Sequence, residues 1–288
     1  MLIGLSFSCS FMVVVICSLI RHLRVEALRD GDTSMLKTND FSFVVFLGLT
    51  TYEPGLLAFE YRPLCIGVLV TKKHVLTLNK CAESSKTLDG KVRIYAGSPD
   101  ITACREYDGV IQLMYNTWAF VRGKPPVPNE YQHFVIVKLS QKVDGTSIRP
   151  VFVPKKGEKF FGSAVKAIGL YPHASAQSMT VATLKILSTS SCKEYLSKNV
   201  QSQAEDTILC TAAPAKITAK DAAGPILSDD DTLVGLSIHN LKSCLPINYH
   251  MQFDFLRNFI ESAIEDEKLE EKPPAGIPIP SKRRRIDE

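Results

Sequence analysis

Short apolar runs separated by Gly, Pro, Asn and Asp follow one another along the chain from Phe41 onward. Many short runs at this spacing are typical of an all-β sandwich or of paired barrels. The runs that we predict to be strands are Phe43–Leu49, Cys65–Val70, His74–Leu78, Val92–Ala96, Val110–Met114, Phe134–Leu139, Ala164–Leu170, Val181–Leu187, Ile208–Cys210, Pro225–Leu227 and Leu233–Ile238.

Two segments depart from this pattern. Ile247–Asp266 carries apolar residues at helical spacing, so we predict that the folded domain closes with a C-terminal helix. Ser190–Ser197 is predicted to form a short helix. Residues 265–288 contain four prolines and end in the basic run Lys282–Arg285, which predicts a disordered tail.

The N-terminal 20 residues hold no Lys, Arg, Asp or Glu, and Val25-Glu26-Ala27 fits the small-x-small rule for signal cleavage. We therefore predict a secretory signal over residues 1–27, followed by a polar N-terminal segment over 28–40. Because Arg21 and Arg24 follow the apolar run, and the run could just span a bilayer, an uncleaved membrane anchor is the alternative.

The chain has 288 residues, a net charge of +4 and eight cysteines. The small charge gives no reason to expect a nucleic-acid partner, and a membrane surface is not expected either. Cys9 and Cys17 lie in the predicted signal. Six cysteines remain, and an even number after a signal predicts disulfides in an oxidising compartment. No CxxC pair exists, and neither a metal nor a cofactor is predicted.

Three segments carry a resemblance to a known family. Cys65–Val70 with Val75–Cys81 is similar to C-G-G-x-L-I with V-L-T-A-A-H-C. Gln132–Leu139 with Ile148–Pro154 is similar to N-D-I-A-L-L-K-L with I-R-P-V-C-L-P. Lys220–Ile226 with Val234–Ser237 is similar to G-D-S-G-G-P-L with V-G-I-V-S-W.

In this order and at this spacing, the segments resemble the trypsin-like serine proteases of the chymotrypsin fold, over roughly residues 41–264. The resemblance implies two packed six-stranded antiparallel β-barrels with a C-terminal helix. It also implies a catalytic triad of His as general base, Asp to orient it and Ser as nucleophile.

None of the three triad roles is filled in this chain. Lys80 stands at the position of the base, His133 at the position of the orienting Asp, and Ala222 at the position of the nucleophile. A lysine amine is protonated at neutral pH, and a methyl group has no lone pair. The resemblance therefore implies a domain that lacks its catalytic triad.

Residues around the triad positions depart from the family as well. Lys220 replaces a glycine of the oxyanion loop, and no Ile-Val-Gly-Gly activation start follows Arg29. Asp221 is present without the amino terminus that pairs with it in the family. Lys216 stands at the position that forms the base of the family's specificity pocket, where it either points outward or makes the site cationic. Together these departures predict an incompletely formed pocket.

The resemblance also implies the disulfides Cys65–Cys81 and Cys192–Cys210. Cys244 matches a family cysteine whose partner position is Thr218, so that bridge is lost. Cys104 has no family partner. Cys104 and Cys244 could pair with each other, pair with another chain or stay free.

The sequence thus predicts a secreted, catalytically inactive serine protease homologue, similar to those common among insect secreted proteins. Such a protein would bind secreted proteins or proteases through the former substrate cleft and the loops around it, in an immune or reproductive protease network. Two alternatives remain at this point. One is an active hydrolase with relocated chemistry, for example with Lys80 as nucleophile. The other is a membrane-anchored version of the same inactive fold.

Overall fold

A computed structural model describes most of the predicted domain and neither end of the chain. The described residues are 40–53, 58–116, 133–145, 148–170, 179–199, 208–212, 224–238 and 247–264. The predictions for the signal, the N-terminal segment and the tail lie outside them. No helix in these ranges is long and apolar enough to cross a membrane.

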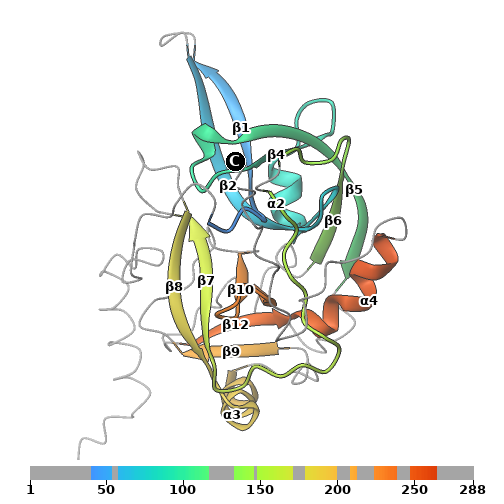
Figure 1. Ribbon diagram of the computed structural model, residues 1–288. Coiled ribbons are helices and arrows are strands. Elements are labelled where there is room, and N and C mark those ends of the chain that lie inside the picture. The colour runs from blue at the N-terminus through green and yellow to red at the C-terminus, as the bar shows by residue number, and fades with distance from the viewer. Residues whose placement is uncertain are drawn as a thin grey trace, which may run out of the picture.

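Six antiparallel strands form the first barrel, closed in the order β1-β2-β3-β6-β5-β4 (Figure 1). A short helix, α2 (Asn79–Ser84), follows β3, and the 3-10 turn Ile101–Ala103 precedes β5. The strands are β1 (Val44–Glu53), β2 (Ala58–Thr71), β3 (His74–Leu78), β4 (Val92–Ala96), β5 (Arg105–Asn116) and β6 (His133–Leu139).

The second barrel repeats this arrangement and closes in the order β10-β11-β12-β9-β8-β7. Helix α3 (Thr189–Asn199) lies between β8 and β9, and helix α4 (Phe253–Ala263) follows β12. The strands are β7 (Ala164–Leu170), β8 (Met179–Ile186), β9 (Ile208–Ala212), β10 (Pro225–Leu227), β11 (Leu233–Ser237) and β12 (Ile247–Gln252). The two predicted barrels and the C-terminal helix are confirmed.

The predicted start of the last helix is wrong. Residues 247–252 form strand β12, and the helix begins only at Phe253. The reason is long-range pairing, because β12 is hydrogen-bonded to β9 on one side and to β11 on the other. A strand at this place completes the ladder that a helix would leave open. The apolar residues that indicated the helix all lie at or after Phe253, and five residues of α4 form its buried stripe: Phe253, Leu256, Phe259, Ile260 and Ala263.

One continuous apolar core joins the barrels. It contains Phe46 and Phe134 of the first barrel, Leu236 of the second, and Phe253 and Ile260 of α4. A smaller cluster, which includes Val165, Leu184 and Ile226, fills the second barrel. Because the main cluster crosses the boundary between the barrels, they are packed as one body.

Strands β1 and β2 continue beyond the barrel as a two-stranded ribbon, which we call the β1–β2 arm. The register shifts between Leu47 and Gly48, and pairing then runs on to Glu53 and Ala58. Strand β4 pairs only with Val45–Leu47 of β1, so the arm is paired only within itself in the described part of the chain. Figure 1 shows it projecting from the first barrel.

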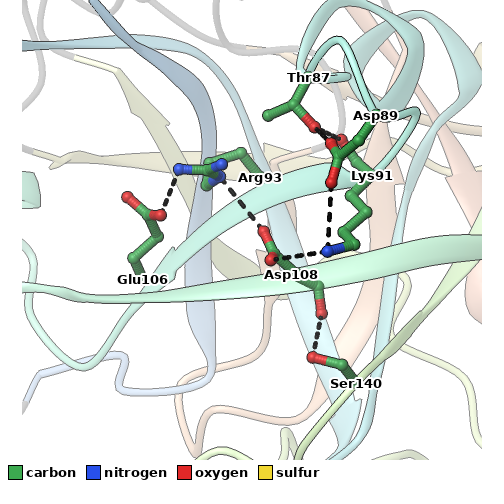
Figure 2. A network of polar contacts seen from close by, with 7 residues as sticks. All are labelled: Thr87, Asp89, Lys91, Arg93, Glu106, Asp108 and Ser140. Atoms are coloured by element: carbon green, nitrogen blue, oxygen red, sulfur yellow. Dashed lines mark hydrogen bonds and ion pairs between the residues drawn. The ribbon is translucent and has the colours of Figure 1, made fainter.

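A polar network covers the outer face of β4 and β5 (Figure 2). Arg93 bonds to Glu106, and its Nε lies 3.3 Å from Oδ1 of Asp108. The Lys91 ammonium lies 3.7 Å from Oδ2 of Asp108. The network thus ties the loop before β4 to the β4–β5 hairpin. Its members are Thr87, Asp89, Lys91, Arg93, Glu106, Asp108 and Ser140.

Candidate active-site position

Lys80 is held by the end of a central strand and by a disulfide. It is the second residue of α2, two residues after β3 ends at Leu78. The next residue, Cys81, is bonded to Cys65 of β2, with a Cα–Cα distance of 5.6 Å. That distance is normal for a disulfide, and the bond joins Cys81 covalently to the barrel. The half-buried Lys80 therefore occupies a fixed position on the first barrel.

His133 is the first residue of β6, and the strand register determines where its backbone lies. Leu78 of β3 pairs with Phe134 of β6, and Asn116 of β5 pairs with His133. The backbone of His133 therefore lies beside the end of β3, where the turn that carries Lys80 begins. The structure thus brings two of the three predicted site positions to one edge of the first barrel.

Ala222 lies outside the described residues, as do Lys216, Thr218, Lys220, Asp221 and Cys244. The description resumes at Gly224, whose carbonyl oxygen accepts a hydrogen bond of 2.8 Å from the backbone N–H of Ser237. Gly224 leads directly into β10. The residue two positions after Ala222 therefore belongs to the second barrel, while Lys80 and His133 belong to the first.

Two histidines that do not belong to the triad positions are buried and bonded within the barrels. His74 of β3 places Nδ1 2.8 Å from Oγ1 of Thr71. His250 of β12 places Nε2 2.8 Å from Oγ1 of Thr211, and burial lowers its pKa to about 3. Both are held by neighbouring hydroxyls. No cluster of His, Cys, Asp and Glu suited to a metal occurs among the residues that the structure describes.

Sequence reasoning gave no role to His250. Its partner Thr211 lies 39 residues away on another strand, and no local motif contains both residues. The only available signal was a polar residue within an apolar strand, Ile247–Gln252, which we had predicted to be helical.

The two predicted disulfides are present. Cys65–Cys81 and Cys192–Cys210 close loops with sequence separations of 16 and 18 residues. Cys104 forms no disulfide within the part of the chain that the structure describes, and its pairing with another chain stays a prediction. Its Sγ donates to the carbonyl oxygen of Ser98 at 3.2 Å, and burial raises its pKa to about 12.

With this arrangement in view, comparison with known proteins gives the family. The model of the trypsin family matches residues 33–258, and the chain belongs to that family. A solved structure of neuropsin, a serine protease expressed in the limbic system of mouse brain, is similar in fold. The matched region covers 80% of this chain and 97% of the neuropsin chain, with a TM-score of 0.57 and 15% sequence identity. No curated protein sequence matches the chain.

Proposed function

We propose that this member of the trypsin family is a secreted protein without protease activity that acts by binding other proteins. The observation that carries the proposal is the place of Lys80. Its neighbour Cys81 forms the disulfide that the family resemblance implied, and the register beside it aligns β3 with β6. These fixed points support the assignment of Lys80 to the position of the general base.

The chemistry of the three positions follows from their side chains. A lysine with an ordinary pKa near 10.4 carries its proton at neutral pH and does not accept another from a nucleophile. His133 offers no carboxylate to orient a base, and Ala222 offers no nucleophile. Loss of the serine or the histidine of such a triad costs on the order of a million-fold in turnover.

Binding is supported by the rigid body and by the β1–β2 arm. Cys65 lies where the arm leaves the barrel, opposite Leu47, and its disulfide joins that point to the turn of Lys80. A partner at the triad edge of the first barrel would therefore have the base of the arm within reach. Loops and extensions on a rigid scaffold are the usual carriers of recognition.

Secretion is supported by the cysteines and by the N-terminal sequence. Two disulfides are formed in the described part of the chain, and such bonds persist in oxidising compartments. The apolar N-terminal stretch has the composition of a secretory leader. Mass spectrometry of the mature N-terminus tests this: a start near Leu28 agrees with cleavage, and an intact Met1 indicates an anchor.

A serine-directed fluorophosphonate probe tests the lack of activity, with active neuropsin as the positive control. We expect no labelling of this chain under conditions that label neuropsin fully. Labelling of a residue at the triad edge would overturn the proposal. Hydrolysis of peptide or ester substrates that disappears in Lys80→Ala would instead identify relocated chemistry at Lys80.

The binding role is tested by capture from the native fluid with a matched bait. Leu49 pairs with Arg62, so residues 50–61 can be replaced by Asn-Gly, which forms a two-residue hairpin turn. We expect proteins that are enriched on the wild-type chain and lost on the shortened one. Equal enrichment on both baits would exclude the arm from binding, and no enrichment on either would contradict the proposed role.

A further inference from the structure

A pocket of about 140 Å³ opens on the second barrel. Its walls come from five segments: the chain between the barrels, β9, β11, β12 and the start of α4. The apolar lining includes Leu209, Val234 and Phe253, all buried, with Phe160 and Phe161 beside them. A cavity of about this volume lined by apolar side chains accepts one benzene-sized group.

Lys80 and His133 belong to the first barrel, and neither of them lines the pocket. Val234 stands at the start of β11, whereas Gly224, which leads back to Ala222, bonds to Ser237 at the other end of that strand. The two positions are three residues apart, about 10 Å along the strand. The pocket therefore lies near the start of β11, whereas Gly224 lies beside the other end of that strand.

The wall formed by the chain between the barrels is fixed in place by α4. The backbone N–H of Gly157 donates to Oδ2 of Asp254 at 3.1 Å. Arg257 bonds to the other oxygen of that carboxylate, at 3.3 Å, and to the carbonyl oxygen of Pro154. Its guanidinium also lies over the ring of Phe253 at 5.2 Å. A preformed wall of this kind lowers the ordering cost of binding.

One aromatic side chain of the wall remains open to solvent. Phe161 is 45% exposed, although phenylalanine is usually buried. It stands at the rim, next to Phe160, which packs against the core of the second barrel. The pocket is therefore an apolar hollow with an exposed aromatic edge.

The chain segment that forms this wall carries three lysines, of which Lys159 lines the pocket. Lys155, Lys156 and Lys159 are exposed, and none of them forms an ion pair within the part of the chain that the structure describes. The nearby carboxylates are already bonded, Glu158 to the backbone N–H of Lys155 at 2.9 Å and Asp254 as above. A partner at the pocket thus meets a wall segment with three exposed ammonium groups that form no ion pair among the described residues.

We propose that this pocket is a docking site for an acidic segment of another protein that inserts one aromatic side chain. The ring would fill the hollow beside Phe161, and carboxylates on either side of it would face the three lysines. The proposal does not depend on whether the triad positions are active.

A labelled peptide, acetyl-Glu-Asp-Phe-Glu-Asp-amide, tests the site by fluorescence anisotropy with the full mature chain. Phe→Ala in the peptide should weaken binding roughly tenfold to a hundredfold, the effect of losing one buried aromatic side chain. In the protein, Phe161→Ser should weaken binding several-fold. Changing Lys155, Lys156 and Lys159 together to Glu should abolish it, and added salt should weaken binding to the wild type.

Matched controls lie elsewhere on the surface. Leu88→Ser removes another exposed apolar side chain and Lys72→Glu another exposed lysine, and neither should change the affinity. All the changed residues are exposed, and circular dichroism checks that each variant folds. The proposal would be overturned if Phe161→Ser left the affinity for the peptide unchanged. It would also be overturned if the peptide with alanine in place of phenylalanine bound as tightly as the original.

Two further outcomes would also overturn it, because they assign the pocket to a different occupant. Binding seen only after truncation at Ile264 would show that the chain's own C-terminal residues fill the pocket. A dimer, detected by sedimentation and abolished by Phe161→Ser, would show that a second copy does.

Discussion

Inside the second barrel, Nε2 of His250 lies 2.8 Å from Oγ1 of Thr211. Both residues are fully buried, His250 on β12 and Thr211 on the neighbouring strand β9. Burial lowers the pKa of His250 to about 3, because a charged imidazolium there would lose its hydration. The neutral imidazole is therefore part of the folded barrel.

This contact predicts a loss of stability in acid. In the unfolded chain His250 has an ordinary pKa of about 6.5, so between pH 6.5 and 3 the unfolded state binds a proton that the folded state does not. The free energy of unfolding should fall by about 1.4 kcal/mol for each pH unit below about 6.5 through this residue alone. Urea unfolding at pH 7, 6, 5 and 4 measures the slope.

The control for this prediction is His250→Gln, which keeps an amide in reach of Thr211 but does not titrate. Carboxylates contribute to the pH dependence of both proteins, so the difference between the two slopes isolates His250. We expect the variant to take up about one proton fewer on unfolding below pH 6. If the free energy of unfolding changed with pH equally in the wild type and the variant, His250 would be protonated in the folded protein.

Gly235 of β11 should not tolerate a side chain. A Cβ atom there would lie 2.4 Å from the carbonyl oxygen of Met251 on the paired strand β12. Relief requires the two strands to separate, so we expect Gly235→Ala to lower the free energy of unfolding by at least about 2 kcal/mol. Chemical denaturation of both proteins provides the measurement.

Gly162→Ala separates this steric effect from backbone strain. Gly162 has a φ of +78°, but nothing lies within 4 Å of a Cβ built on it. Only the left-handed conformation opposes alanine there, at a cost of about 1 kcal/mol. If Gly235→Ala were no more destabilising than this control, the result would contradict the close approach of β11 and β12 at Gly235.

The strands predicted from apolar runs were found because their signal is local. Residues 247–252 show the limit of that reasoning. Ile247, Tyr249 and Met251 alternate with Asn248 and His250, a strand period, yet all five are buried because β12 lies between β9 and β11. Polar residues on one face of a fully buried strand give no clear sequence signal, and the apolar spacing of α4 directly after them favoured a helix.

The candidate active-site position and the pocket also differ in whether their sequence signal is local. Lys80 and His133 could be assigned because each lies within a short motif, beside Cys81 and at the start of the run Phe134–Leu139. The pocket at Phe161 could not, since its walls come from five segments that meet only when the second barrel closes. The ion pairs and hydrogen bonds that fix its wall join residues up to 103 positions apart.

Removal of either disulfide should destabilise the domain by a similar amount. Their loops have sequence separations of 16 and 18 residues, and the chain-entropy relation gives about 3 kcal/mol for each. We expect Cys65→Ala/Cys81→Ala and Cys192→Ala/Cys210→Ala each to lower the free energy of unfolding by about that amount, as measured by urea denaturation. A loss below about 1 kcal/mol in either variant would show that the unfolded chain is already restricted there.

Cys104 should be unreactive as long as the domain is folded. Its Sγ donates to the carbonyl oxygens of Ser98 and Asp100, and burial raises its pKa to about 12. At pH 8 roughly one thiol in ten thousand would then be the reactive thiolate. Unfolding returns the pKa to its ordinary value near 8.5 and exposes the sulfur. Iodoacetamide should therefore modify this cysteine only in denaturant.

Comparison with Cys104→Ala isolates this thiol from the other cysteines of the chain. Mass spectrometry of the native proteins at pH 8 should give the same number of added groups for wild type and variant. In urea without reductant, the wild type should carry one more group than the variant, because only Cys104 differs between them. One extra group on the native wild type would mean that the segment from Ser98 to Cys104 opens readily and that its two hydrogen bonds do not protect the sulfur.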